Sequence, residues 1–244
     1  MDIFAWLTDP ANWSGLGSIP FQTLMHLLYS AITLVIAALI AVPLGLYVGH
    51  TGKGESLIMG SVNAMRALPT LGLLILLVLL LAPRISNSLA FVIPSLAVLV
   101  LLAVPPILSG VASGIRAIDR SVIDAARGMG YSTSEIIWKI EMPCALPLTL
   151  SGVRGATLQV VSTATVAAYV SLDGLGRFII DGRAANDYAE MAGGAILLAA
   201  LAILLELSFS IVSKFVVSPG LTRKQKRPAA AEQFESATTA IQVV

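Results

Sequence analysis

Long hydrophobic runs alternate along the chain with short polar segments. Five of these runs reach or approach the about 20 residues that a helix needs to cross the hydrocarbon core of a bilayer. They cover approximately residues 27–48, 57–81, 89–108, 148–170 and 191–217. The pattern therefore predicts an all-α integral membrane protein with about five transmembrane helices.

Prolines in the second and third runs are expected to disturb their helices. Pro69 lies in the second run, whereas Pro94, Pro105 and Pro106 lie in the third. A proline inside a helix removes a backbone donor, which membrane proteins tolerate where neighbouring helices or water satisfy the freed carbonyl group. We therefore expect both of these helices to be kinked or interrupted.

The distribution of Lys and Arg residues orients the predicted helices. When the five runs are threaded through a membrane, only three of the 15 basic residues, Arg84, Arg177 and Arg183, fall on one side. Cytoplasmic loops are enriched in Lys and Arg, so the other side is expected to be the cytoplasm. The N-terminus then lies outside the membrane and the C-terminus lies in the cytoplasm.

This topology divides the chain into three parts. Residues 1–22 are expected to form an extracytoplasmic or interfacial segment, in which Asp2–Thr8, with Trp6, suits a helix at the membrane surface. Residues 23–218 form the transmembrane domain. Residues 219–244 are basic and then rich in Ala, Gln and Thr, which predicts a disordered cytoplasmic tail.

The composition supports this class and excludes several kinds of chemistry. The chain is 57% hydrophobic and 12% charged, whereas a soluble domain carries about 25% charged residues. A net charge of +1 gives no basic field for nucleic acid. One cysteine, two histidines and the lack of a Gly-Lys-Ser/Thr sequence leave little for a metal site, a Cys–His dyad or bound nucleotide. We therefore expect no enzyme activity, catalytic residue, metal or cofactor on this chain.

The loop between the third and fourth runs, residues 115–147, predicts a compact helix–turn–helix on the cytoplasmic side. Gly128 and Gly130 follow a short helical stretch, at the position where glycine commonly ends a helix. Ser132 and Glu135 fit a capping box that begins a second short helix, and Pro143 is expected to end that helix. Taken singly, each residue also fits an ordinary amphipathic loop helix.

The spacing in this loop resembles the cytoplasmic signature of ABC importer permeases. That signature is Glu-Ala-Ala, three residues, Gly, nine residues, then Ile-x-Leu-Pro. The chain has Asp124–Ala126, Gly130 and Ile140–Pro143 at these spacings, with Asp in place of Glu and Met in place of Leu. In the resembling family, the loop docks on a separate ATPase subunit. The resemblance implies this ATPase-coupling role for Asp124, Ala125, Ala126, Gly130, Ile140 and Pro143.

Further stretches resemble the osmoprotectant and quaternary-amine permeases with the MetI-like fold. They are residues 63–74, 104–119, 145–154 and 172–176, and Asp173 stands where these permeases carry a glycine. The resemblance implies import of glycine betaine, choline, carnitine or a similar solute across the cell membrane. It also implies three partners: ATPase subunits that bind the ATP, a second permease subunit, identical or related, and an extracytoplasmic substrate-binding protein.

Polar residues within the predicted spans are candidates for the substrate pathway. Gln159, Ser162 and Thr163 lie in the fourth run, and Glu206 lies in the fifth. An acid inside a span is costly and often functional, although pairing with a neighbouring helix also explains Glu206. Hydrogen bonding between helices explains the other three residues equally well.

Two other functions stay open. A MetI-like permease for another small solute, such as an amino acid, would share the fold, and the sequence shows no aromatic cage for a quaternary amine. An ion-driven secondary transporter would be expected to show internal repeats and several ion-binding acids. Glu206 is the only acid deep in a predicted span, which makes that second alternative weaker.

Overall fold

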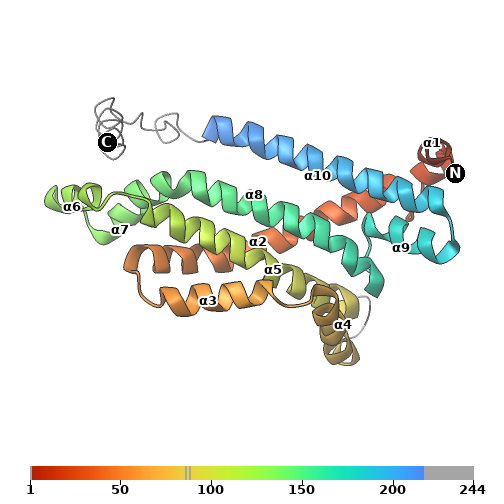
Figure 1. Cartoon of the computed structure of the whole chain (residues 1–244), viewed down its shortest axis with the longest axis horizontal. Helices are drawn as coiled ribbons and strands as arrows, with labels where there is room; N and C mark the ends of the chain where they lie inside the picture. Colours follow the sequence, from red (N-terminus) through yellow and green to blue (C-terminus); the bar gives the residue numbers. More distant parts are fainter. Residues whose placement is uncertain (1, 86, 88, 217–244) are drawn as a thin grey trace, which may run out of the picture.

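The computed structural model describes residues 2–85, 87 and 89–216, and every regular element in this part of the chain is helical (Figure 1). Most of the long helices lie side by side in an elongated bundle. In chain order, the elements are α1 (Ile3–Thr8), η1 (Pro10–Trp13), α2 (Ile19–Thr51), α3 (Glu55–Arg66), α4 (Thr70–Leu81), η2 (Ala82–Arg84), α5 (Leu89–Arg116), α6 (Arg120–Gly128), α7 (Thr133–Ile136), the π-helical turn η3 (Ile137–Glu141), α8 (Met142–Ala167), η4 (Ala168–Val170), α9 (Gly176–Ala185) and α10 (Tyr188–Val216).

Helices α2, α5 and α8 form the core of the bundle because small residues let their backbones approach closely. A Cβ atom built on Gly110 of α5 would lie 2.6 Å from the Leu148 carbonyl oxygen of α8. One built on Gly45 of α2 would lie 2.7 Å from Cβ of Val111 in α5. Glycines at such crossings are typical of packed membrane helices, so these three helices form one tightly packed unit.

Four helical stretches are long and apolar enough to cross a membrane, judged by length and composition alone. They are Ile19–Thr51, Leu89–Arg116, Thr133–Val170 and Tyr188–Val216. Each overlaps one of the predicted hydrophobic runs and has at least one end outside it. The helix α2 begins at Ile19, within the N-terminal segment 1–22 that was expected to precede the transmembrane domain.

The second predicted run is not one continuous helix. It is divided into α3 and α4, with the break at residues 67–69. Pro69 disfavours helical geometry at the residue before it, so the chain turns here, and Figure 1 shows α4 directed away from the bundle axis. The expected interruption at Pro69 is confirmed. By contrast, α5 stays helical through Pro94, Pro105 and Pro106.

The predicted helix end at Pro143 is wrong. Helical structure runs from Thr133 to Val170 without a break, and Pro143 lies in the first turn of α8. The Met142 N–H just before it bonds to the Ile137 carbonyl oxygen in the wider π-helical pattern, and the helix continues past the proline although its ring carries no N–H. The preceding π-helical turn η3 widens the backbone at this junction. The connection between the long helices is therefore shorter than the predicted loop 115–147.

The N-terminal helix α1 is anchored to the bundle through an aromatic contact. The Trp6 ring meets the Phe178 ring of α9 edge to face, with 5.2 Å between ring centroids. The Trp6 side chain also lies against Gly193 of α10. The predicted tail, residues 219–244, lies outside the described residues.

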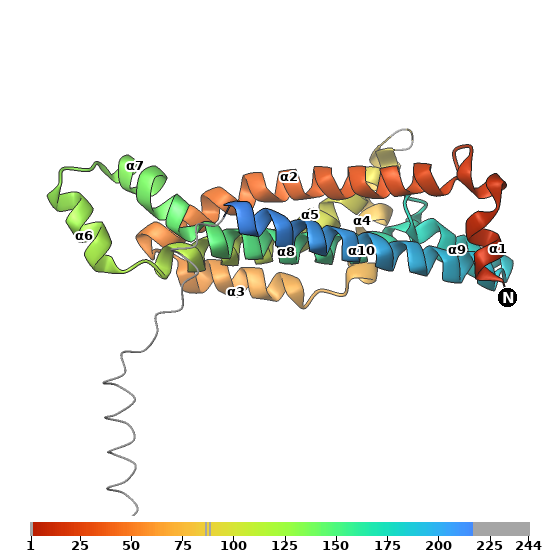
Figure 2. The ribbon, with the colours of Figure 1, turned by 90° about the horizontal axis from the view of Figure 1, so that it is seen from above.

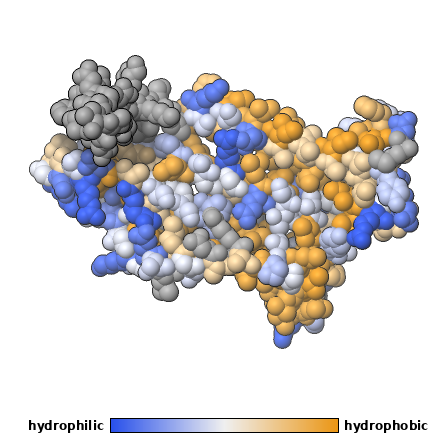
Figure 3. Space-filling model, viewed as in Figure 1, coloured by the Kyte–Doolittle hydropathy of each residue, from blue (hydrophilic) through white to orange (hydrophobic). Residues whose placement is uncertain are grey.

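Two helices present broad apolar surfaces to the outside of the bundle. Along α10, exposed side chains include Ile203, Leu204, Leu207 and Ile211. Figure 3 shows hydrophobic surface along α10 and over α4, whereas the end that carries α6 and α7 is hydrophilic. Apolar surface of this extent is what a lipid-facing helix requires.

Candidate functional site

The helices α6 and α7, with the turn between them, project beyond one end of the bundle (Figure 2). We call residues 117–136 the knob. Asp119 caps α6, because its Oδ1 accepts a hydrogen bond from the Ser121 backbone N–H at 2.9 Å. This bond lowers the pKa of the Asp119 carboxyl below its ordinary value. The cap therefore stays ionised at the positive end of the helix dipole.

The predicted glycine turn and capping box are both present. Gly130 has φ of +87°, and a Cβ there would meet nothing within 4 Å, so backbone conformation rather than space favours glycine. The Ser132 hydroxyl accepts the Glu135 N–H, and the Glu135 carboxylate accepts the Ser132 N–H at 3.0 Å. Together these bonds fix the start of α7 and the fold of the knob.

The knob separates the predicted coupling residues into exposed and buried sets. Asp124, Ala125 and Gly130 are exposed, and Asp124 pairs with Arg127 across 3.5 Å. Ala126 is only 1% exposed, so its small side chain packs in the interior of the knob. Ile140, half-buried, and Pro143, exposed, lie outside the knob, in the helical stem that leads into α8.

Two large apolar side chains on or beside the knob were missed by the sequence reasoning. Met129 is 71% exposed and Trp138 is 62% exposed. Exposed aromatic and Met side chains are enriched at protein interfaces. Their positions, one between the two glycines and one just after the capping box, are the signal that could have identified them. The end of the bundle thus presents a surface suited to docking a protein.

The knob joins the bundle through two polar contacts that the sequence did not predict. Glu141, only 4% exposed, lies with its two carboxylate oxygens 2.8 and 2.9 Å from Nδ1 of His50, at the end of α2. Arg116, at the end of α5, forms an ion pair with Glu55, at the start of α3. Residues 50–55 therefore contact both segments that join the knob to the bundle, the end of α5 at Arg116 and the turn η3, which we call the stems of the knob.

The pathway candidates on α8 lie partly on an outer face of that helix. Ser162 is exposed and Gln159 is half-buried. Ser151 and Gly155, which are also exposed, continue the same face at helical spacing. This stripe of small and polar residues contrasts with the apolar outer face of α10. It is the kind of face that meets water or another protein rather than lipid.

Glu206 of α10 pairs with Arg154 of α8. The Arg154 Nε donates to Glu206 Oε2 at 2.8 Å, and both side chains are partly exposed. An acid and a base that neutralise each other reduce the cost of placing either within a span. Of the two explanations offered for Glu206, the structure contains the pairing with a neighbouring helix.

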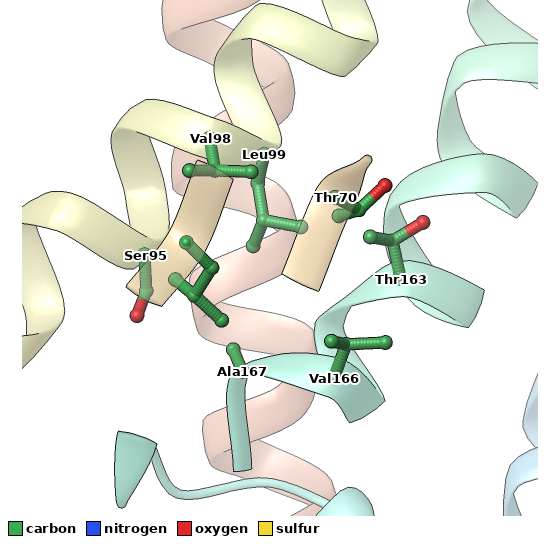
Figure 4. A pocket seen from close by; sticks show the side chains of 8 residues that line it. Thr70, Ser95, Val98, Leu99, Thr163, Val166 and Ala167 are labelled. Atoms are coloured by element: carbon green, nitrogen blue, oxygen red, sulfur yellow. The ribbon is translucent and has the colours of Figure 1, made fainter. Parts of the chain in front are cut away.

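Thr163 lines a small cavity between α4, α5 and α8, together with Thr70, Ser95 and apolar side chains (Figure 4). The cavity of about 10 Å³ has room for roughly one water molecule. It is too small for an organic solute. Within residues 2–85, 87 and 89–216, no three His, Cys, Asp or Glu side chains gather to hold a metal ion.

A buried polar row on α2, at the end opposite the knob, also escaped prediction. The Gln22 Oε1 accepts the Gly174 N–H at 2.6 Å, and His26 Nε2 lies 3.0 Å from the Val161 carbonyl oxygen of α8. The four-residue spacing of Gln22, His26 and Ser30 was the available signal. The Gln22 contact holds the turn before α9 against α2, and the His26 contact joins α2 to α8.

Comparison with known proteins gives consistent matches. The profile of the family described as "Binding-protein-dependent transport system inner membrane component" matches residues 41–218. The choline transport system permease protein OpuBB of Bacillus subtilis is 28% identical over 207 residues, which are 85% of this chain and 92% of that protein. The carnitine transport permease protein OpuCD of Listeria monocytogenes is 31% identical over 78% of this chain and 82% of its own length.

Solved structures share the fold at lower identity. The inward-facing MetNI methionine ABC transporter contains a chain that superposes with a TM-score of 0.72 at 21% identity, over 86% of this chain and all of that one. An amino acid ABC transporter gives a TM-score of 0.63 at 18% identity, over 88% of this chain and 97% of that one. At these identities the likeness concerns the fold.

Proposed function

Because this chain belongs to the family of binding-protein-dependent transport system inner membrane components, we propose that it is the permease subunit of an ATP-driven importer for quaternary-amine compatible solutes. Glycine betaine, choline and carnitine are the solutes of this class. ATP hydrolysis takes place on separate ATPase subunits, and a substrate-binding protein delivers the solute from outside. A second permease subunit completes the membrane part of the complex.

The observation that carries this proposal is the knob at one end of the bundle. Its two short helices are capped and project from the bundle. Ala125 and Met129 are exposed on the knob, and Trp138 is exposed beside it. A rigid, exposed element with apolar anchors suits a groove on a partner protein. The predicted spacing of Asp124–Ala126 and Gly130 falls on this element.

The topology proposed from the basic residues agrees with the arrangement of the two ends. Arg177 and Arg183 lie in α9, at the same end of the bundle as the N-terminus, whereas α6 and α7 lie at the opposite end (Figure 1). With the N-terminus outside, the knob is cytoplasmic. We assign the second of five crossings to α3 and α4 together, because each has 12 residues and neither alone spans a hydrocarbon core of about 30 Å.

The substrate class rests on the relatives. The permeases from Bacillus subtilis and Listeria monocytogenes are named for choline and carnitine. The stripe of Ser151, Gly155, Gln159 and Ser162 on the outer face of α8 supports a pathway beside this helix, where a second subunit would cover it. A weakly polar, cage-free lining suits a pathway, because a transported solute must leave as readily as it arrives.

Transport in this scheme is alternating access by rigid bodies. Closure of the two ATPase subunits on ATP moves the knobs, and the helix bundles turn from inward-facing to outward-facing. The loaded binding protein then releases its solute to the pathway. Hydrolysis returns the bundles to the inward-facing state.

The test is reconstitution of the chain with its ATPase and binding protein in proteoliposomes. Uptake of labelled glycine betaine, choline, carnitine and methionine is measured with ATP and with a non-hydrolysable analogue inside. We expect ATP-dependent uptake of at least one quaternary amine and none of methionine. Uptake of methionine alone would favour the amino-acid permease instead. Uptake driven by an ion gradient without ATP would rule out both.

A further inference from the structure

The turn between α2 and α3 contacts both stems of the knob. On one side, His50 in the last turn of α2 meets Glu141 at the end of η3. On the other, Glu55 at the start of α3 pairs with Arg116 at the end of α5. Gly52 and Gly54, with φ of +66° and +68°, form the tight turn between these two contacts. Two stems that are distant in sequence therefore meet one short segment.

The two contacts differ in their surroundings. The Glu141 side chain is almost fully buried and that of His50 is mostly buried, whereas Arg116 and Glu55 are both substantially exposed. Exposed ion pairs contribute little, because water competes for each partner. Removing one partner of a buried pair leaves the other without compensation. The His50–Glu141 contact is therefore the one that fixes the stem against α2.

The backbone at Glu141 departs from regular α-helical geometry. Glu141 is the last residue of the π-helical turn η3, and α8 begins directly after it. π-helical turns are local irregularities that occur frequently at functional sites. The stem can thus change geometry at η3, and Glu141 is the point where such a change meets another helix.

The other partner, α2, is a single helix that reaches both ends of the bundle. Beyond His50 it is packed on α5 through Gly45 and Gly49. At its opposite end, Gln22 holds the Gly174 turn and His26 contacts Val161. A displacement applied at His50 is therefore applied to one helix that continues through Pro43 to the far side of the bundle.

We propose that His50 and Glu141 are positioning residues that transfer movement of the knob to α2. The proposal rests on the proposed function, since it requires an ATPase that moves the knob. Without this contact, the knob still docks on the ATPase and responds to ATP, but the bundle does not follow. Loss of the His50–Glu141 contact should therefore leave ATP hydrolysis without transport.

The first experiment compares Glu141→Gln, His50→Gln and the double variant in the reconstituted complex. Uptake of the transported solute and ATP hydrolysis are measured in the same vesicles. For each single variant we expect uptake per ATP to fall about tenfold, while hydrolysis stays within about twofold of the wild type, because a buried contact is lost away from the ATPase. The double variant should match the single ones, since both remove the same contact.

Lys139→Gln is the matched control. It removes an exposed pair with Glu135 at 2.8 Å, in the same stem and two residues from Glu141. Uptake per ATP should stay within about twofold of the wild type, as for other exposed pairs. Unchanged coupling in Glu141→Gln would overturn the proposal. So would a parallel loss of uptake and hydrolysis, because that would indicate a folding role alone.

A second measurement needs no substrate and separates this inference from the proposed function. Spin labels are placed at Tyr47 of α2 and Val122 of the knob, both exposed, in a Cys144→Ser background. In the wild type we expect the distance between labels to stay constant when ATP is added to the complex, because knob and α2 move together. In Glu141→Gln the distance should change with ATP. An equal response in both proteins would refute the contact's role, even if no quaternary amine is transported.

Discussion

Glycines occur both in the α2–α5–α8 core and in the knob, but those in the core are closely surrounded and those in the knob are not. In the core, a Cβ on Gly110 or Gly114 would collide with the backbone of α8. In the knob, a Cβ on Gly128 or Gly130 would meet nothing within 4 Å. The same residue type therefore provides close approach in one region and backbone conformation in the other. This difference separates substitutions that disturb the whole bundle from those that disturb only the knob.

The largest expected effect is in the core. A Cβ on Gly152 would lie 2.5 Å from the Pro106 carbonyl oxygen, so Gly152→Ala should destabilise the protein by about 1–3 kcal/mol, as overpacking does. Thermal unfolding in detergent measures this loss. Gly155→Ala, one turn along the same helix, meets nothing within 4 Å and should leave stability unchanged or slightly higher. Equal melting temperatures of the two variants would contradict the expected clash at Gly152.

The next effect is in the knob and concerns coupling rather than folding. Gly130→Asp places a side chain at a φ of +87°, which costs roughly 1–2 kcal/mol for residues other than glycine. We expect normal membrane insertion and about tenfold lower ATP-driven uptake, since the turn is distorted where we propose that the ATPase docks. Gly128→Ala, which has open space around it, is the control and should transport normally. Wild-type uptake by Gly130→Asp would argue against the docking role of the turn.

A third change tests the exposed apolar anchor beside the knob. Trp138→Ala should leave the bundle folded and weaken binding of the ATPase subunit by about 2 kcal/mol, the size expected of an aromatic hot spot. Affinity is measured with the purified permease in nanodiscs. Tyr188 is similarly exposed but lies at the start of α10, so Tyr188→Ala should not affect this affinity. If both variants bind the ATPase equally well, Trp138 is not an anchor.

The smallest effect comes from the capping box. Ser132→Ala removes the hydroxyl that accepts the Glu135 N–H, and loss of such a cap costs about 1 kcal/mol. Hydrogen exchange at residues 133–137 should become faster, while exchange in the α2–α5–α8 core is unaltered. Ser134→Ala, in the same short helix but outside the cap, should leave exchange near the wild-type rate.

Much of this organisation could be predicted because it depends on local signals. The lengths of the hydrophobic runs identified the long helices, and the capping box of Ser132 and Glu135 identified the start of α7. Pro143 was misread, since the helix continues through it after the π-helical turn η3, and no local sequence signal predicted that turn. The contact between His50 and Glu141 joins residues 91 positions apart. No local pattern encodes such a partner, just as none revealed that Glu206 meets Arg154.

The break at Pro69 has a consequence for how the chain is made. Neither α3 nor α4 is long enough to cross the hydrocarbon core alone, and unsatisfied backbone groups at the break are unfavourable in lipid. Both helices pack against α5, which follows them in the sequence. During biogenesis, we expect this stretch to stay close to the translocon until α5 has emerged from the ribosome. Insertion of the proposed second crossing would then depend on α5.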